Sequence, residues 1–131
     1  MKKIVLILRF TIAINALILT NACSSNAQNA IAPAAFEAKM AQPNVQLVDV
    51  RTPQEFANGH LENAQNINYN DPKFKENIAL LDKSKPIAVY CGVGGRSGKA
   101  AKILVELGFK DITDLAGGIT AWTAASKKVV K

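Results

Sequence analysis

One segment of the sequence combines the residue types that sulfur or anion chemistry requires. Cys91 opens the run Cys-Gly-Val-Gly-Gly-Arg-Ser at residues 91–97. A glycine-rich loop between a strand and a helix can turn successive backbone N–H groups inward, and the helix end adds positive potential. These donors and Arg96 would stabilise a thiolate and lower the pKa of Cys91 from about 8.5 toward neutrality. The segment therefore predicts an activated cysteine nucleophile in a cradle that would also stabilise a persulfide anion.

The candidate site consists of this cysteine and the loop around it. We expect Cys91 to be the catalytic residue. We expect substrate to be bound by Gly92, Val93, Gly94, Gly95, Arg96 and Ser97. The chain has two cysteines in total, which rules out a disulfide-rich scaffold and a multi-cysteine zinc site. We therefore predict no metal site, and we expect no cofactor.

The elements that would position this loop alternate between strand and helix. Residues 86–90 form a continuous apolar run, which is typical of a parallel strand buried on both faces. Ser97 can cap a helix that runs to Leu107 and stops at Gly108. Further strands are expected at residues 45–50, 64–69 and 111–115, and helices at 33–41, after a capping box at Thr52–Glu55, after Asp71-Pro72 and after Gly117-Gly118. This alternation predicts an α/β fold, a small central parallel sheet with helices on both faces, and it places Cys91 where such sheets bind ligands.

Four segments, in the same order, resemble the motifs of single-domain rhodanese sulfurtransferases. The loop resembles the family's active-site pattern of Cys, any two residues, Gly, any residue, Arg and Ser. The other three are Val48-Asp49-Val50-Arg51 with Glu55-Phe56, Gly59-His60-Leu61 through Asn66-Ile67 with Asn63 where glycine is usual, and Gly117-Gly118-Ile119 with Trp122. The resemblance extends over most of residues 32–125 and implies a rhodanese-like fold.

The resemblance also implies a reaction. Cys91 would attack the sulfane sulfur of a donor, either thiosulfate or a persulfide, and would become a persulfide itself. It would then pass that sulfur to a thiol or to cyanide, so that one transfer is split into two displacements. Arg96 would orient the loop or neutralise the bound anion. Members that prefer thiosulfate often have additional basic side chains in this loop, and their absence here disfavours thiosulfate as the physiological donor.

Two other functions remain open beside this enzyme. Cysteine phosphatases place five residues between Cys and Arg, whereas Cys91 and Arg96 are separated by four, and the smaller ring suits a single sulfur atom rather than an oxyanion. The second alternative is a non-catalytic module of the cell envelope that carries a persulfide or docks onto a partner. A docking domain would need neither Cys91 nor Arg96, which favours the enzyme.

Several residues outside the loop have structural interpretations. Arg51 follows a strand end and is a candidate residue of the site's mouth, but Glu55 lies four residues further on, and a structural Arg51–Glu55 ion pair is the preferred interpretation. His60 is expected to make a structural hydrogen bond, because transfer from a low-pKa thiolate needs no general base. Trp122 is expected to pack in the core.

The start of the chain has the composition of a targeting segment. Residues 1–22 read as a secretory signal peptide: a basic start, a short apolar stretch and small residues before a polar run. Cys23 after Ala22 resembles the lipobox of bacterial lipoproteins, so residues 23–31 are expected to be a lipidation site and flexible tether. Cleavage after Ala27 and an N-terminal core helix are the alternatives. We expect an exported protein of the cell envelope or periplasm, anchored to a bacterial membrane through lipid on Cys23.

The whole chain is 131 residues long, which leaves room for one domain after the targeting segment. We assign residues 32–126 to the rhodanese-like domain and residues 127–131 to a basic tail. The net charge is +6, but removal of Lys2, Lys3 and Arg9 reduces the 16 basic residues to 13, against 10 acidic ones. The basic residues that remain are scattered, so we expect no nucleic-acid partner. The expected partners are a small sulfur-containing substrate or a persulfide-bearing protein, and we expect a monomer.

Overall fold

The protein is built around one parallel sheet. The structure is a computed structural model that describes residues 28–131. Its strands are β1 Gln28–Ile31, β2 Gln46–Asp49, β3 Gln65–Asn66, β4 Ile87–Tyr90 and β5 Ile112–Leu115. They lie in the order β1-β5-β4-β2-β3, and every neighbouring pair is parallel.

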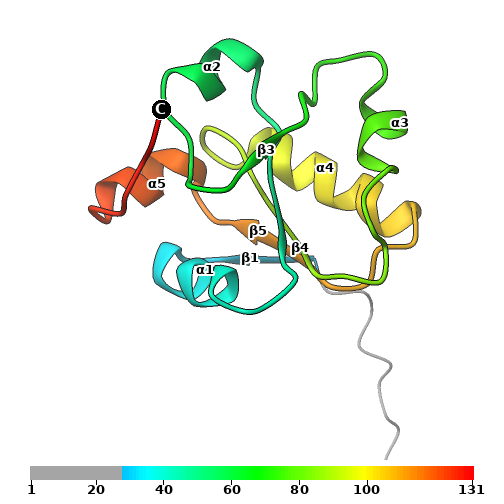
Figure 1. The fold of residues 1–131 in the computed structure, drawn as a ribbon, viewed down its shortest axis with the longest axis horizontal. Coiled ribbons are helices and arrows are strands. Elements are labelled where there is room, and N and C mark those ends of the chain that lie inside the picture. The colour runs from blue at the N-terminus through cyan, green and yellow to red at the C-terminus, as the bar shows by residue number, and fades with distance from the viewer. Residues whose placement is uncertain (1–27) are drawn as a thin grey trace, which may run out of the picture.

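Helices cover both faces of this sheet. They are α1 Pro33–Met40, α2 Pro53–Ala57, α3 Phe74–Ile78, α4 Gly95–Glu106 and α5 Gly118–Ala124. In Figure 1, α1 and α5 lie on one side of the sheet, and α3 and α4 lie on the other. Two separate clusters of buried apolar side chains correspond to these two faces. The α/β fold with helices on both faces, expected from the sequence, is confirmed.

Strand β4 lies at the centre of the sheet and ends at the candidate nucleophile. Its four residues are all fully buried. Ile87 and Val89 pack in the cluster beneath α3 and α4, whereas Ala88 and Tyr90 pack in the cluster beneath α1 and α5. A strand paired on both sides and covered on both faces is rigid, so the backbone at Cys91 has a fixed position.

The predicted strand at residues 64–69 is shorter in the structure. Only Gln65 and Asn66 form the ladder with β2. The chain nevertheless stays beside β2, because the N–H groups of Ile67 and Tyr69 donate to carbonyl oxygens of Asp49 and Val50, each at 2.9 Å. Within residues 28–131, β3 is the last strand of the sheet and has no partner on its outer side, which explains why its regular pairing ends early.

Both ends of the predicted domain need correction. Residues 28–31, expected to be the end of a flexible tether, form β1 and pair in register with β5 along its edge. The sequence Gln-Asn-Ala-Ile has weak strand propensity, so only the free edge of β5 makes it a strand. Residues 127–131, expected to be a tail outside the domain, are bound to it. Val130 bridges His60 through two backbone hydrogen bonds of 2.8 and 2.9 Å, and the Lys128 carbonyl accepts a 2.8 Å hydrogen bond from Trp122.

The predicted signal peptide, the lipidation site at Cys23 and residues 24–27 of the tether lie outside the described residues. Between residues 28 and 131, no helix has the length and apolar character needed to cross a membrane.

Candidate active site

Cys91 lies at the carboxyl end of β4, and its side chain is held by backbone donors. The residue is 1% exposed, and the N–H of Gly94 donates to Sγ at 3.0 Å. Burial raises the pKa of the Cys91 thiol, but hydrogen bonds from the Ser97 side chain and backbone and from the backbone of Gly94 and Val93 outweigh it. The net pKa is therefore below the ordinary value, in the direction expected from the sequence.

The helix that follows the loop begins earlier than the sequence suggested. Gly94 occupies the cap position with φ of 113°, a conformation that favours glycine, and α4 starts at Gly95. The prediction that Ser97 caps the helix is wrong, because the turn at Gly94 brings the chain into the helix before Ser97. Ser97 instead lies fully buried in the first turn, and its Oγ lies 3.3 Å from the Gly94 carbonyl oxygen.

The start of α5 fixes the other side of the loop. The N–H groups of Ile119 and Thr120 donate to the carbonyls of Cys91 and Gly92 at 2.9 and 3.1 Å. A Cβ atom on Gly118 would lie only 2.5 Å from each of these carbonyl oxygens. Gly118 is therefore required by close backbone approach, a role that the glycine pair in the sequence signals but does not explain.

Arg96 does not extend freely toward the loop's centre. It forms a bidentate ion pair with Glu55, at 2.7 and 2.9 Å, and both side chains are partly exposed. The Arg96 hydrogen bond, assisted by Thr52 and opposed by burial, lowers the pKa of Glu55 to about 2. Glu55 also completes the predicted capping box with Thr52, which is confirmed. A helix-capping carboxylate therefore holds the arginine of the loop that follows Cys91.

Arg51 has a different partner from the one predicted. Instead of Glu55, its guanidinium binds Asp49 through contacts of 2.7 to 3.1 Å and donates to the Gly59 carbonyl at 2.7 Å. Both charged side chains are buried. The physical reason is competition: Arg96 occupies both oxygens of Glu55, while the Asp49 carboxylate needs a counter-charge inside the protein.

The two predictions for aromatic residues outside the loop are confirmed. His60 makes a structural hydrogen bond, in which Nδ1 donates to the Phe56 carbonyl at 2.9 Å, and its ring stacks on Phe56 with centroids 3.8 Å apart. Trp122 is buried and packs edge-on against Phe36, with centroids 6.2 Å apart.

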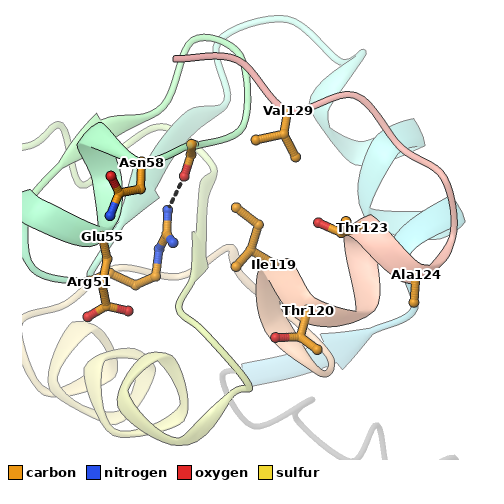
Figure 2. A pocket seen from close by; sticks show the side chains of 9 residues that line it. Arg51, Glu55, Asn58, Ile119, Thr120, Thr123, Ala124 and Val129 are labelled. Atoms are coloured by element: carbon orange, nitrogen blue, oxygen red, sulfur yellow. Dashed lines mark hydrogen bonds between the residues drawn. The ribbon is translucent and has the colours of Figure 1, made fainter.

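A cavity of about 490 Å³ lies beside the loop, between α2 and α5 (Figure 2). Arg51 and Glu55 line it from the side of α2, and Ile119, Thr120 and Thr123 line it from α5. Cys91 is not among its lining residues. The cavity adjoins the loop through Ile119 and Thr120, whose backbone groups bind the Cys91 and Gly92 carbonyls. Arg51, the candidate mouth residue, thus lines this cavity, and its guanidinium is paired with the Asp49 carboxylate.

One buried carboxyl group near the loop had no signal in the sequence. Asp114 of β5 is 5% exposed, and its Oδ1 is the single buried side-chain oxygen or nitrogen within residues 28–131 that has no hydrogen-bond partner. Burial raises the pKa of Asp114, while hydrogen bonds from Ser97 and from the backbone of Leu115 oppose the rise. Ser97 thus interacts with both Cys91 and Asp114.

Comparison with known proteins agrees with this geometry. Residues 32–125 match the family described as Rhodanese-like domain. The chain is 39% identical over 83 residues to the thiosulfate sulfurtransferase GlpE of Shewanella oneidensis, which covers 63% of this chain and 80% of that protein. It is 36% identical over 72 residues to the thiosulfate sulfurtransferase PspE of Escherichia coli, which covers 55% and 68%.

Solved structures show the same fold. A rhodanese-related protein from Thermoplasma volcanium superposes with a TM-score of 0.69 and 31% identity, over 78% of this chain and 97% of that one. A rhodanese-like domain protein from Staphylococcus aureus gives 0.64 and 30%, over 72% and 91%. The protein is thus an α/β protein with a cysteine-containing loop after the central strand of its sheet. The chain belongs to the rhodanese-like domain family. Its relatives GlpE and PspE support sulfurtransferase activity at the level of this family.

Proposed function

We propose that this protein is a rhodanese-type sulfurtransferase that works through a persulfide on Cys91. The donor is thiosulfate or a persulfide, and the acceptor is a thiol or cyanide. The observation that carries the proposal is the 3.0 Å hydrogen bond from the Gly94 N–H to Sγ, in a loop that lowers the pKa of the thiol. A thiolate is the nucleophilic form of cysteine, so this loop prepares Cys91 for attack.

The reaction consists of two displacements on sulfur. The Cys91 thiolate attacks the outer sulfur of the donor, a new S–S bond forms, and the donor's own bond to that sulfur breaks. The leaving group is sulfite when the donor is thiosulfate, and a thiolate when the donor is a persulfide. An acceptor thiolate or cyanide then attacks the outer sulfur of the Cys91 persulfide, and Cys91 leaves as a thiolate. The backbone donors of residues 92–97 stabilise the negative charge at each stage.

Direct detection of the intermediate tests the proposal. Protein treated with thiosulfate and then desalted should gain the mass of one sulfur atom, about 32 Da, on the peptide that contains Cys91. Addition of cyanide should remove this mass and release one equivalent of thiocyanate. A gain in mass without turnover would instead favour the non-catalytic persulfide carrier. Hydrolysis of an aryl phosphate without any sulfur transfer would favour the phosphatase.

We also propose export and lipidation at Cys23. The support is the composition of residues 1–22 and the resemblance of Ala22-Cys23 to a lipobox. Replacement of Cys23 by Ala should release the protein from membranes or block its processing. A wild-type protein that fractionates as soluble, with Gln28 as its first residue, would show cleavage after Ala27.

A further inference from the structure

The cations beside the catalytic loop are already neutralised by carboxylates of the protein itself. Glu55 binds Arg96 through both of its oxygens, at 2.7 and 2.9 Å. Asp49 binds Arg51 at 2.7 Å, and both side chains are buried. The four groups carry two positive and two negative charges. A dianion that approaches the loop therefore meets no net positive charge from these side chains.

The rest of the cavity wall is uncharged. Ile119 and Val129 supply apolar surface, and Thr120, Thr123 and Asn58 supply neutral polar groups. Figure 2 shows Ile119 near the centre of this wall, with Val129 from the C-terminal segment opposite the threonines of α5. Such a lining suits an uncharged organic group that has some hydrogen-bonding capacity.

We propose that this cavity binds the uncharged organic part R of a persulfide donor R–S–SH, and that Glu55 selects against dianionic donors by holding Arg96. The inference rests on the proposed function and names the substrate class for it. In the transfer, the Cys91 thiolate bonds to the outer sulfur of R–S–SH, and the S–S bond between the inner and the outer sulfur of the donor breaks. The products are the Cys91 persulfide, which keeps the hydrogen, and the thiolate R–S⁻.

The position of the cavity fits this role. Ile119 and Thr120 line it and also bind the Cys91 and Gly92 carbonyls. Glu55 lines it and also binds Arg96 of the same loop. A group R held there adjoins the loop that holds Sγ. Because Arg96 keeps the pKa of Glu55 at about 2, the carboxylate stays charged throughout the neutral range.

Replacement of Glu55 by Gln tests the charge. Glutamine is also suited to position N3 of a capping box, three residues after the N-cap, so helix α2 should keep its start. Freed Arg96 should attract a dianion, and the KM for thiosulfate should fall about fivefold, which corresponds to about 1 kcal/mol. The KM for benzyl persulfide, whose organic group is uncharged, should change much less. Glu37→Gln is the matched control, because it removes an exposed ion pair with Lys127 that is not part of the site.

Replacement of Thr123 by Phe tests the cavity. Thr123 is exposed on α5, so a larger side chain can fill the cavity without disturbing the core. The KM for benzyl persulfide should rise at least fivefold more than the KM for thiosulfate. Ala125→Phe is the control, because Ala125 is exposed nearby on the chain and does not line the cavity.

The two donors separate the outcomes. An unchanged KM for thiosulfate in Glu55→Gln, or equal effects of Thr123→Phe on both donors, would overturn this inference while the sulfurtransferase stands. If neither donor forms a persulfide on Cys91 in the wild type, the proposed function fails, and this inference fails with it.

Discussion

Two neighbouring strands of the sheet end in ionisable groups that are stabilised in opposite ways. The β2 corner, residues 49–55, contains Asp49 and Arg51, whose buried side chains satisfy each other. The β4 loop, residues 91–97, contains Cys91, whose sulfur is held by backbone N–H groups and a serine. In the first region, the Arg51 guanidinium neutralises the Asp49 carboxylate. In the second, backbone N–H dipoles stabilise the sulfur of Cys91.

The two arrangements have different consequences for stability and reactivity. A buried ion pair is saturated, and removal of one partner leaves an uncompensated charge, so its loss destabilises the fold. A backbone cradle stabilises negative charge at its centre, whether the charge is on a thiolate or on the outer sulfur of a persulfide. The β4 loop can therefore stabilise a thiolate and, in the proposed mechanism, a persulfide, whereas the groups of the β2 corner cannot exchange partners without a loss of stability.

Replacement of Cys91 by Ser should abolish sulfur transfer and leave the unfolding midpoint close to that of the wild type. A serine hydroxyl is too weakly acidic to replace the thiolate in the cradle. Cyanide-dependent production of thiocyanate and thermal unfolding give the two readings. Thiocyanate production by the variant above background would show that the β4 loop does not contain the nucleophile.

Replacement of Arg51 by Met should lower the stability of the fold. Asp49 would be left buried without its cation, and the free energy of unfolding should fall by about 3–5 kcal/mol. Urea titration measures this loss. The double variant Asp49→Asn with Arg51→Met should recover part of it, because no buried charge would remain. If the single variant unfolds like the wild type, the β2 corner is not the stabilising ion pair that we describe.

Replacement of Ser97 by Ala should raise the pKa of Cys91. The hydroxyl contributes to the hydrogen bonds that lower it, and one hydrogen bond in a protein contributes about 1 kcal/mol. The midpoint of the alkylation rate against pH should therefore move upward, and sulfur transfer at pH 7 should fall by up to about tenfold. Ser84→Ala, at an exposed site away from the loop, serves as the control. An unchanged midpoint would mean that backbone donors alone set this pKa.

Replacement of Asp114 by Asn should stabilise the protein slightly. Asp114 is a buried carboxyl like Asp49, but no arginine accompanies it, and burial raises its pKa. With a folded pKa above the unfolded one, ionisation costs stability at pH 7, and the cost disappears as pH falls below the ordinary pKa of about 3.9. The variant should gain up to about 1 kcal/mol at pH 7 and nothing at pH 3. Thermal unfolding at both pH values checks this, and a loss at pH 7 would contradict it.

The elements that depend on local pattern could be predicted from the amino-acid sequence. The apolar run before Cys91 predicted the buried strand β4, because four consecutive apolar residues can be buried only if both faces are covered. The box at Thr52–Glu55 predicted the start of α2, because capping involves residues three apart in the chain. The glycines between Cys91 and Arg96 predicted a loop whose backbone could face the sulfur, and the lowered pKa agrees with this.

The pairing of groups that are distant in the chain could not be predicted in this way. Glu55 lies four residues from Arg51 in the chain, yet it binds Arg96, 41 residues away, because α2 and the start of α4 meet at the same edge of the sheet. Asp114 shares Ser97 with Cys91 for the same reason. Residues 28–31 become a strand only because β5 offers them a free edge. Such choices depend on how the chain brings competing partners together, and their energies are set by burial, which local sequence does not contain.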